Sequence, residues 1–270
     1  MPALGIGTWM MGEHRRDRKK EVAAIALGLD LGMTLIDTAE MYGEGGAEEV
    51  VGEAIAGRRD QVFLVSKVLP QNASRAGVPR ACEASLRRLG TDRLDCYLLH
   101  WPGRHPLADT IAAFERLRRE GKIRAWGVSN FGVEELERAA ALAGAERIAC
   151  NQVLYHLEER TIEHAVVPWC VARGIAVAGY SPFGSGRFPG PRSRGGRVLA
   201  EIAAAHGATP RQVALAFLVR APGLFTIPKA ARAAHVAENA RAGSLALSAE
   251  DLRRIDAAFP RGPWRGLPIL

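Results

Sequence analysis

The sequence predicts an α/β protein with the architecture of a (β/α)8 TIM barrel, in a single domain spanning residues 1–270. Short runs rich in β-branched residues alternate with amphipathic runs along the whole chain, and eight strands that are each followed by a helix are typical of such a barrel. The competing architecture, an open doubly wound sheet, needs a GxGxxG turn after its first strand to hold a dinucleotide, and the sequence contains none. No linker rich in Pro, Gly or Ser divides the chain.

The first half of the chain contains four expected pairs of strand and helix. The strands are residues 4–8, 34–37, 62–67 and 95–100, and the helices are residues 18–31, 47–56, 79–89 and 107–120. The first helix is amphipathic, because Val22 and Ile25 recur at helical spacing on one face. Glycine follows three of these helices, at Gly32, Gly90 and Gly121, where its left-handed conformation ends a helix.

The second half continues the same alternation. Its strands are residues 123–129, about 149–152, 175–180 and 225–228, and its helices are residues 133–143, 163–173, 198–206, 210–220, 235–242 and 249–259. Gly174 ends the helix over residues 163–173. Two helices are expected between the last two strands, after a loop rich in Gly and Arg, and two more after the last strand.

Polar or ionisable residues follow or end seven of the expected strands. They are Asp37, Ser66 with Lys67, His100, Ser129 with Asn130, Asn151 with Gln152, Tyr180 with Ser181, and Lys229, and Tyr42 lies five residues after Asp37. The active residues of (β/α)8 barrels lie at the carboxyl ends of the strands. Each residue alone could cap a helix or satisfy a backbone group. Seven such endings at one rim instead predict a functional site.

Composition limits the partners and the compartment. Lys and Arg exceed Asp and Glu by 36 − 29 = 7, which suits nucleic acid or an anionic small molecule. Only 6% of the residues are aromatic and none form a stacking array, so we expect no nucleic-acid partner. The sparse Cys82, Cys96, Cys150 and Cys170 form no CxxC pair, which predicts buried thiols in a reducing compartment and no metal site. Without a leader or a long apolar run, we expect a cytoplasmic monomer that does not contact membranes.

Seven motifs give the chain a family resemblance. They are IDTAEMYGEGGAEEVVGEAI (residues 36–55), VSKV (65–68), LDCYLLHWP (94–102), GVSNF (127–131), NQVLYH (151–156), YSPFGSG (180–186) and IPKA (227–230). In this order they resemble the aldo-keto reductase superfamily, over a stretch from Leu4 to Phe259. Within the superfamily, DTAEMY, the short HWP loop and IPKA followed by HVAEN are most similar to bacterial reductases of methylglyoxal and related small aldehydes.

The resemblance implies the roles of four residues. Tyr42 would be the general acid, Lys67 the cation that lowers the tyrosine pKa, and Asp37 the partner of Lys67, while His100 would hydrogen-bond the substrate carbonyl. This set suits carbonyl reduction, because a free phenol has a pKa of about 10 and a neighbouring cation stabilises phenolate. A buried carboxylate offsets the burial of that cation, and a fixed donor stabilises oxyanion charge. The alternative is a structural Asp–Lys ion pair with an incidental Tyr and His.

An apolar mouth is expected around Tyr42 and His100. Trp9, Met41 and Trp101 would line it for the substrate, with Phe131 as a further candidate, although each could equally pack at the rim. The loops there are short, which predicts a shallow pocket for small or varied carbonyls.

The resemblance also implies an NADPH site. Ser129, Asn130 and Gln152 would bind the nicotinamide carboxamide, and Tyr180 would stack on its ring. Glycine lets a loop approach phosphate closely, as expected of the segment over the pyrophosphate. That segment comprises Ser181, Pro182, Phe183, Gly184, Ser185 and Gly186. The remaining implied contacts are Gly7, Thr8, Trp9, Asp37, Ile227, Pro228, Lys229, Ala230 and His235, with Glu238 and Asn239 beside the adenine.

Two positions depart from the family pattern. Relatives that select NADP often carry Lys, then Ser, then Arg six residues beyond the Lys, whereas this chain has Lys229, Ala230 and His235. Because His does not replace a bidentate guanidinium, we expect NADPH with weaker discrimination, so NADH is possible too. In addition, residues 1–3 leave no room for the hairpin that usually precedes the first strand, so that hairpin is expected to be short or missing.

The expected activity is therefore NADPH-dependent reduction of small aldehydes and ketones, such as methylglyoxal or aromatic aldehydes, to alcohols. Fold alone does not fix function, so a non-enzymatic barrel that senses NADP(H) as a regulatory subunit is the alternative. A pure binding role would not require Asp37, Tyr42, Lys67 and His100 together.

Overall fold

The computed structural model describes residues 2–270 and shows eight parallel strands, each paired with the next in chain order. They are β1 (Ile6–Gly7), β2 (Leu35–Asp37), β3 (Phe63–Val68), β4 (Leu94–Leu99), β5 (Ile123–Ser129), β6 (Ile148–Leu154), β7 (Ala176–Tyr180) and β8 (Leu224–Thr226). The Gly5 N–H donates to the Thr226 oxygen over 2.8 Å, and the Gly7 N–H donates to the Pro228 oxygen over 3.2 Å. These bonds join the first and last strands, so the predicted barrel is confirmed.

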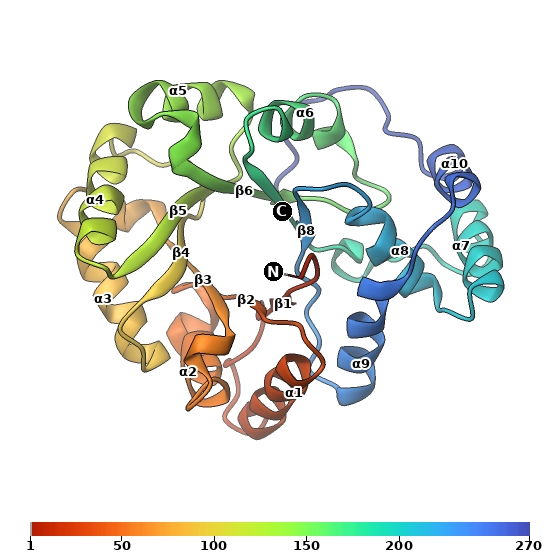
Figure 1. The fold of residues 1–270 in the computed structure, drawn as a ribbon, viewed down its shortest axis with the longest axis horizontal. Coiled ribbons are helices and arrows are strands. Elements are labelled where there is room, and N and C mark those ends of the chain that lie inside the picture. Colours follow the sequence, from red (N-terminus) through yellow and green to blue (C-terminus); the bar gives the residue numbers. More distant parts are fainter. Residues whose placement is uncertain (1) are drawn as a thin grey trace.

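Ten α-helices of the described residues surround the strands (Figure 1). They are α1 (Arg18–Asp30), α2 (Gly46–Ala54), α3 (Gly77–Leu89), α4 (Leu107–Arg119), α5 (Val133–Ala143), α6 (Val166–Val171), α7 (Arg194–Ala205), α8 (Pro210–Leu218), α9 (Ala233–Arg241) and α10 (Ala249–Ala258). The order of the elements agrees with the sequence-based expectation, including two helices between β7 and β8 and two after β8.

The largest difference from the expected elements concerns the helix over residues 163–173. The structure has a short 3-10 turn, Thr161–Glu163, and then only α6. The Glu163 carboxylate accepts hydrogen bonds from Arg160 and Tyr155. These contacts hold the start of the segment against the loop after β6. At the other extreme, α7 begins four residues before its expected start, because the Ser193 hydroxyl caps it by accepting from the Gly196 N–H over 2.9 Å.

Two apolar layers fill the molecule. The larger one lies between the strands and the helices and includes the fully buried Trp126, Tyr97 and Phe114. The smaller one lies among the strands and contains Leu35, Val65, Cys96, Leu98 and Ile227. Parallel strands that are covered on both faces read as nearly continuous apolar runs, as β3 and β4 do. The carboxyl ends of the strands are thus the place where polar groups can gather.

The ends of the barrel and its surface have three further features. Residues 2–5 form no hairpin, and Leu4 instead bridges Thr226 of β8. Cys82, Cys96 and Cys170 are buried and free as expected, whereas Cys150 is only half-buried.

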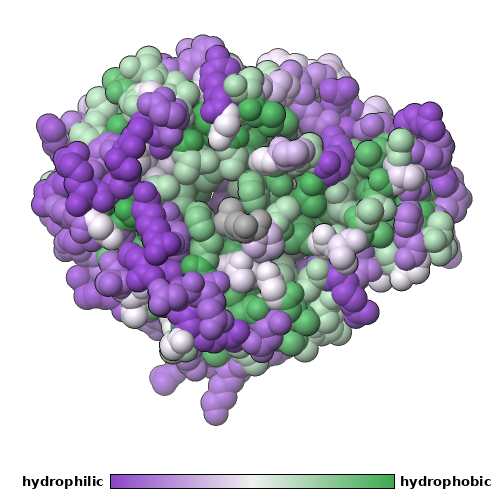
Figure 2. Space-filling view, in the orientation of Figure 1, coloured by the Kyte–Doolittle hydropathy of each residue, from purple (hydrophilic) through white to green (hydrophobic). Residues whose placement is uncertain are grey.

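Figure 2 looks onto one end of the barrel, where hydrophobic residues gather toward the centre and hydrophilic residues cover the outer helices. None of the helices within residues 2–270 has the length and apolar character needed to cross a bilayer.

We predict that Gly127→Ala destabilises the barrel by about 1–3 kcal/mol. A β-carbon at this position of β5 would lie 2.5 Å from the Cys150 oxygen and 2.9 Å from Leu98 Cδ2, where the pairing of β5 with β6 shifts register. Urea unfolding followed by circular dichroism measures the change. Gly190→Ala is the control, because its β-carbon would meet nothing within 4 Å. Equal losses in both variants would contradict the packing argument.

Candidate active site

Four polar side chains meet at the carboxyl ends of β2, β3 and β4. Asp37 is the last residue of β2, Lys67 lies next to the end of β3, and His100 directly follows β4. Because neighbouring parallel strands end at the same edge, these three residues come together although they are far apart in sequence. Tyr42 joins them from the 3-10 turn Tyr42–Gly45, in which Gly43 has a φ of 57°. A β-carbon on Gly43 would lie 2.9 Å from the Met11 oxygen, so the turn needs glycine.

The Lys67 ammonium is the centre of this group. Its Nζ donates to Asp37 Oδ2 over 2.7 Å, to the Thr38 oxygen over 2.9 Å and to the Tyr42 hydroxyl over 3.2 Å. The side chain is fully buried, with 0% of its surface exposed. An ammonium has three N–H donors, so all of them have partners, which is the condition under which a buried ion pair is tolerated.

The ionisation states follow from burial and from the Asp37 charge. Burial lowers the pKa of Lys67, but the neighbouring carboxylate outweighs this and leaves the pKa above its usual value, so Lys67 stays charged. Burial raises the pKa of Tyr42, and Lys67 opposes that rise without reversing it. Lys67 therefore acts on the tyrosine pKa in the expected direction, while burial leaves that pKa above its ordinary value in the protein alone. Tyr42 is a protonated phenol at neutral pH, with a cation beside its oxygen.

His100 is a neutral imidazole at this rim. Burial and then the positive charge of Lys67 lower its pKa to about 3. Its ring lies edge-on to that of Tyr42, with 5.8 Å between the centroids. Among the described residues, its buried Nδ1 has no hydrogen-bond partner. A neutral imidazole keeps one N–H, so His100 can donate a hydrogen bond but carries no charge.

Aromatic and sulfur-containing side chains border the four polar residues. Trp9 is 52% exposed and its ring packs edge-on to Tyr42, with centroids 5.0 Å apart. Trp101 is half-buried, 4.7 Å from the His100 ring, and the half-buried Met41 packs against the core. Phe131 is instead buried in the core and is not a mouth residue. The exposed Met10, which follows Trp9, was not predicted from sequence; its φ of 62° places it in a strained conformation.

The next three strand ends are linked to the same group by hydrogen bonds. Gln152 Nε2 donates to Asp37 Oδ1 over 2.7 Å, and the Ser129 hydroxyl donates to the Gln152 oxygen over 2.9 Å. Asn130 Nδ2 donates to the His100 oxygen over 3.1 Å, while Asn130 Oδ1 accepts from the Tyr180 hydroxyl over 3.0 Å. Both polar atoms of Asn130 therefore have protein partners, and this residue acts first as a brace between β4 and β7.

The loop after β7 has the backbone of an anion cradle. Ser181, Gly184, Ser185 and Gly186 all have positive φ, and the last two are exposed. Successive N–H groups in such conformations form a concave anion site. The loop is held from below, because Phe183 packs edge-on to Phe188 and the Arg211 guanidinium lies over both rings. Pro182 is buried, so the segment is fixed by packing, and the Gly184 N–H closes the turn by donating to the Ser181 oxygen over 2.8 Å.

The segment after β8 contributes exposed basic side chains. Lys229 and His235 are exposed, and Arg232 precedes the first residue of α9, whose N-terminus favours phosphate. Glu238 accepts from the Thr209 hydroxyl over 2.6 Å, and Asn239 is buried. The other predicted contacts lie deeper. Ile227, Pro228 and Ala230 are buried, as are Gly7 and Thr8, whose hydroxyl donates to the Asp37 backbone oxygen over 3.0 Å.

The C-terminal tail, defined as residues 260–270, also reaches the site. Burial raises the pKa of Tyr180, and the backbone N–H of Leu270, directed at the tyrosine hydroxyl, opposes that rise. In Figure 1 the tail runs from α10 past α6 to the centre of the barrel. Sequence reasoning missed this contact, because no motif connects the tail with β7.

Together these groups provide a protonated phenol, a fixed cation beside it and an uncharged hydrogen-bond donor. The Tyr180 ring and the loop after β7 lie at the same rim. A phenol held against an ammonium can give up its proton, because the cation stabilises the phenolate that remains. The aromatic face of Tyr180 and the loop after β7 fit a ligand with a flat ring and a phosphate chain. The arrangement is that of an enzyme that adds a proton to an oxygen while a bound dinucleotide takes part.

Comparisons with known proteins agree with this description. The sequence matches the model of the Aldo/keto reductase family over residues 3–259. The chain is 50% identical over 261 residues to "Methylglyoxal reductase YeaE" of Escherichia coli K12, covering 96% of this chain and 92% of the relative. A crystal structure of an aldo/keto reductase from Klebsiella pneumoniae in complex with NADP and acetate has a TM-score of 0.95 at 49% identity, covering 100% of this chain and 96% of that one.

A second Klebsiella pneumoniae structure, an aldo-keto reductase in complex with NADPH, has a TM-score of 0.95 at 48% identity, covering 100% of this chain and 95% of that one. The family match extends from the residues before β1 to the end of α10, so it includes every strand end described above. The chain therefore belongs to the aldo/keto reductase family.

Proposed function

We propose that the chain reduces small aldehydes and ketones to alcohols with NADPH, and that methylglyoxal and aromatic aldehydes are among its substrates. The observation that carries this proposal is the buried Lys67 ammonium, which touches Tyr42 over 3.2 Å and Asp37 over 2.7 Å beside the neutral His100. The names of relatives support it, since one is a methylglyoxal reductase of Escherichia coli and another, of Bacillus subtilis, is a glyoxal reductase at 35% identity over 260 residues.

In this proposal each residue has a separate task. NADPH supplies the hydride for the carbonyl carbon when it is bound. Tyr42 transfers its phenolic proton to the carbonyl oxygen, and Lys67 stabilises the phenolate left behind. Asp37 keeps Lys67 charged and in place, while the N–H of His100 hydrogen-bonds the carbonyl oxygen as negative charge develops on it. Trp9, Met41 and Trp101 exclude water from one side of the substrate.

The cofactor would lie across the barrel end from Tyr180 to α9. Tyr180 would offer a flat face to the nicotinamide ring, and Gln152 and Ser129 would bind the carboxamide. The loop from Ser181 to Gly186 would hold the pyrophosphate. Lys229, with Arg232 and His235 near the start of α9, would face the 2′-phosphate, and Glu238 and Asn239 would lie at the adenine. Because the guanidinium usual at position 235 is replaced by imidazole, NADH should be accepted too.

One copy of the chain in the cytoplasm is the proposed working unit, because all the residues of the site come from a single chain. The small carbonyl substrate is the partner that this site requires, and neither nucleic acid nor a membrane has a part in the proposed reaction.

Tyr42→Phe should lower kcat by about 10²–10⁴-fold, because it removes the proton donor. NADPH binding, measured by fluorescence titration, should change by less than about threefold, since the phenyl ring remains. The matched control is Tyr97→Phe, which removes a buried hydroxyl that has no partner among the described residues. Wild-type protein that binds NADPH but turns over no aldehyde of a broad panel would instead favour the sensing barrel.

The pH profile of kcat/KM for carbonyl reduction should show no ionisation of a histidine. His100, with a pKa of about 3, is neutral throughout the neutral range, and burial raises the pKa of Tyr42 above its ordinary value, so the phenol stays protonated there. We therefore expect kcat/KM for reduction to be level from about pH 6 to 9 and to fall only above that range. A step near pH 6.5 that disappears in His100→Gln but persists in His206→Gln would contradict this assignment.

Lys229→Ala should lower kcat/KM for NADPH by about 10–100-fold, because one charge-assisted contact to the 2′-phosphate contributes about 1.5–3 kcal/mol. The value for NADH should stay within about threefold. Lys122→Ala is the control, because Lys122 pairs with Glu83 and directly precedes β5, at the amino end of that strand and not at the carboxyl ends that form the site. An equal loss with both cofactors would remove Lys229 from the 2′-phosphate site.

A further inference from the structure

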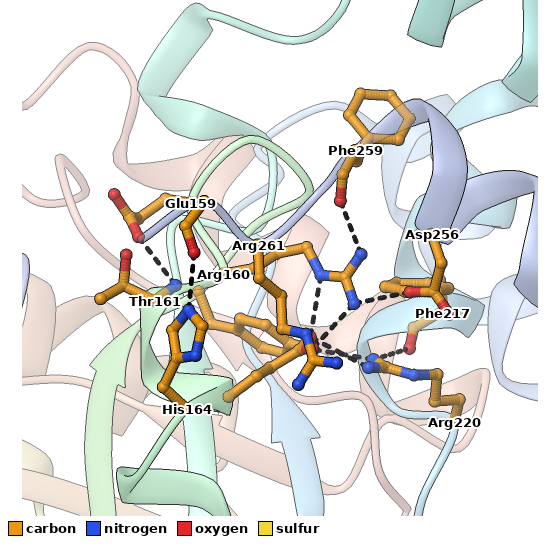
Figure 3. A network of polar contacts seen from close by, with 12 residues as sticks. Glu159, Arg160, Thr161, His164, Phe217, Arg220, Asp256, Phe259 and Arg261 are labelled. Carbon is orange, nitrogen blue, oxygen red and sulfur yellow. Dashed lines mark hydrogen bonds and ion pairs between the residues drawn. The ribbon is translucent and has the colours of Figure 1, made fainter. Parts of the chain in front are cut away.

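A buried ionic cluster lies under the start of the C-terminal tail (Figure 3). We define the Arg160 cluster as Tyr155, Arg160, Glu163, Arg220 and Asp256. These residues come from the loop after β6, the end of α8 and the last turn of α10, so the cluster joins three segments that are distant in sequence. The Arg160 side chain is only 3% exposed and that of Glu163 only 8%.

Arg160 holds the end of α10 and the residue after it. Its Nη1 donates to the Phe259 backbone oxygen over 2.7 Å, and its Nη2 donates to Asp256 Oδ1 over 2.6 Å. The same guanidinium donates to both oxygens of Glu163, over 3.0 Å and 2.7 Å. A planar guanidinium has donors in fixed directions, so these contacts set both the position and the angle at which the chain leaves α10.

Glu163 supplies the charge that keeps this arrangement together. Arg220 Nη2 donates to its Oε1 over 2.9 Å, and the Tyr155 hydroxyl donates to the same oxygen. Burial raises the pKa of Glu163, but hydrogen bonds from Arg160 and Tyr155 and the charge of Arg220 outweigh it and lower the pKa to about 2. The carboxylate is therefore ionised throughout the pH range in which the enzyme would work.

The first residues of the tail continue along the same cluster. His164 Nε2 lies 2.8 Å from the Gly262 oxygen, and Arg261 Nε lies 3.8 Å from Glu163 Oε2. Further on, Leu267 packs against the core. The tail is thus fixed from its start, and only its last residues are free of the cluster.

The far end of the tail lies at the site. Figure 1 shows the chain ending at the centre of the barrel, and the backbone of Leu270 lies beside the Tyr180 hydroxyl, which donates to Asn130 Oδ1 over 3.0 Å. Asn130 in turn donates to the backbone oxygen of His100 over 3.1 Å. The tail therefore leads from the Arg160 cluster to Tyr180, which two hydrogen bonds connect through Asn130 to the backbone of His100, the residue that faces the carbonyl in the proposed reaction.

We propose that Arg160 is a positioning residue for the carbonyl substrate: it anchors the start of the tail and thereby sets where the tail's last residues meet Tyr180 at the mouth. Arg160 itself touches neither substrate nor cofactor. The tail carries the exposed apolar side chains of Trp264, Ile269 and Leu270, so its placement determines how much apolar surface the mouth offers to the substrate. This inference rests on the proposed reductase function.

The test is Arg160→Met in the full chain and in a variant that lacks residues 264–270. In the full chain we expect KM for the aldehyde to rise about tenfold, with kcat reduced less than KM is raised; a misplacement of about 1 Å at a site can cost as much as about 10²-fold, so a partial displacement of the tail suffices. In the shortened chain the same substitution should leave KM unchanged. A merely structural role of Arg160 would change KM by the same factor in both backgrounds, and that result would overturn the proposal.

Arg59→Met is the matched control. Arg59 makes an equally dense set of contacts, to Asp95 and to the backbone oxygens of Val62 and Arg93, far from the tail. It should lower the melting temperature without raising KM. If Arg160→Met does not fold, the milder Asp256→Asn carries the same comparison between the two backgrounds, with a smaller rise in KM in the full chain.

The same assay separates the two proposals. A wild-type chain without aldehyde turnover would refute the proposed function. An active wild type whose KM is the same in Arg160→Met or Asp256→Asn as in the wild type would leave the function standing and refute the positioning role.

Discussion

One buried cation organises the site. The ammonium of Lys67 has no access to water, so it is tolerable only where Asp37, the Thr38 oxygen and the Tyr42 hydroxyl are all within hydrogen-bonding distance. Satisfying those donors fixes the end of β2, the turn after it and the end of β3 relative to one another. The other oxygen of Asp37 accepts from Gln152, so the constraint extends across the barrel to β6. The hydrogen bonds that stabilise the buried ammonium therefore also hold Tyr42 in the position needed for proton transfer.

The barrel makes this arrangement possible because parallel strands bring all their carboxyl ends to one rim. Around that rim the polar contacts continue from Gln152 to Ser129, Asn130 and Tyr180, and the loop after β7 is held rigid by Phe183, Phe188 and Arg211. The outer helices contribute packing, apart from α9, whose start faces the cofactor in the proposed function, and the tail after α10 returns to the mouth. The site is therefore built from contacts between neighbouring strand ends, to which the tail adds a contact from the far end of the sequence.

Much of this could be predicted from the sequence, for a definite reason. Strand ends are marked locally, so Asp37, Lys67 and His100 could be placed on one rim once the alternation of strands and helices was recognised. The net rise in the pKa of Tyr42 could not, because it depends on how far burial outweighs the effect of Lys67. Nor could the short α6 or the attachment of the tail, since Arg160 meets Phe259 and Asp256 across the fold and no periodic pattern records such a contact. None of the seven family motifs includes Arg160 or the tail.

The seam between β1 and β8 has a consequence for how the molecule is made. Gly5 bonds to Thr226 and Gly7 to Pro228, so the first and last strands of the chain depend on each other. During synthesis the seven earlier strands emerge before β8 is available, and contacts of such long sequence separation form late and slowly. Until then β1 and β7 are both unpaired edges, which expose the interior to water and to neighbouring chains. The nascent protein is therefore most vulnerable to aggregation in the interval before its last fifty residues leave the ribosome.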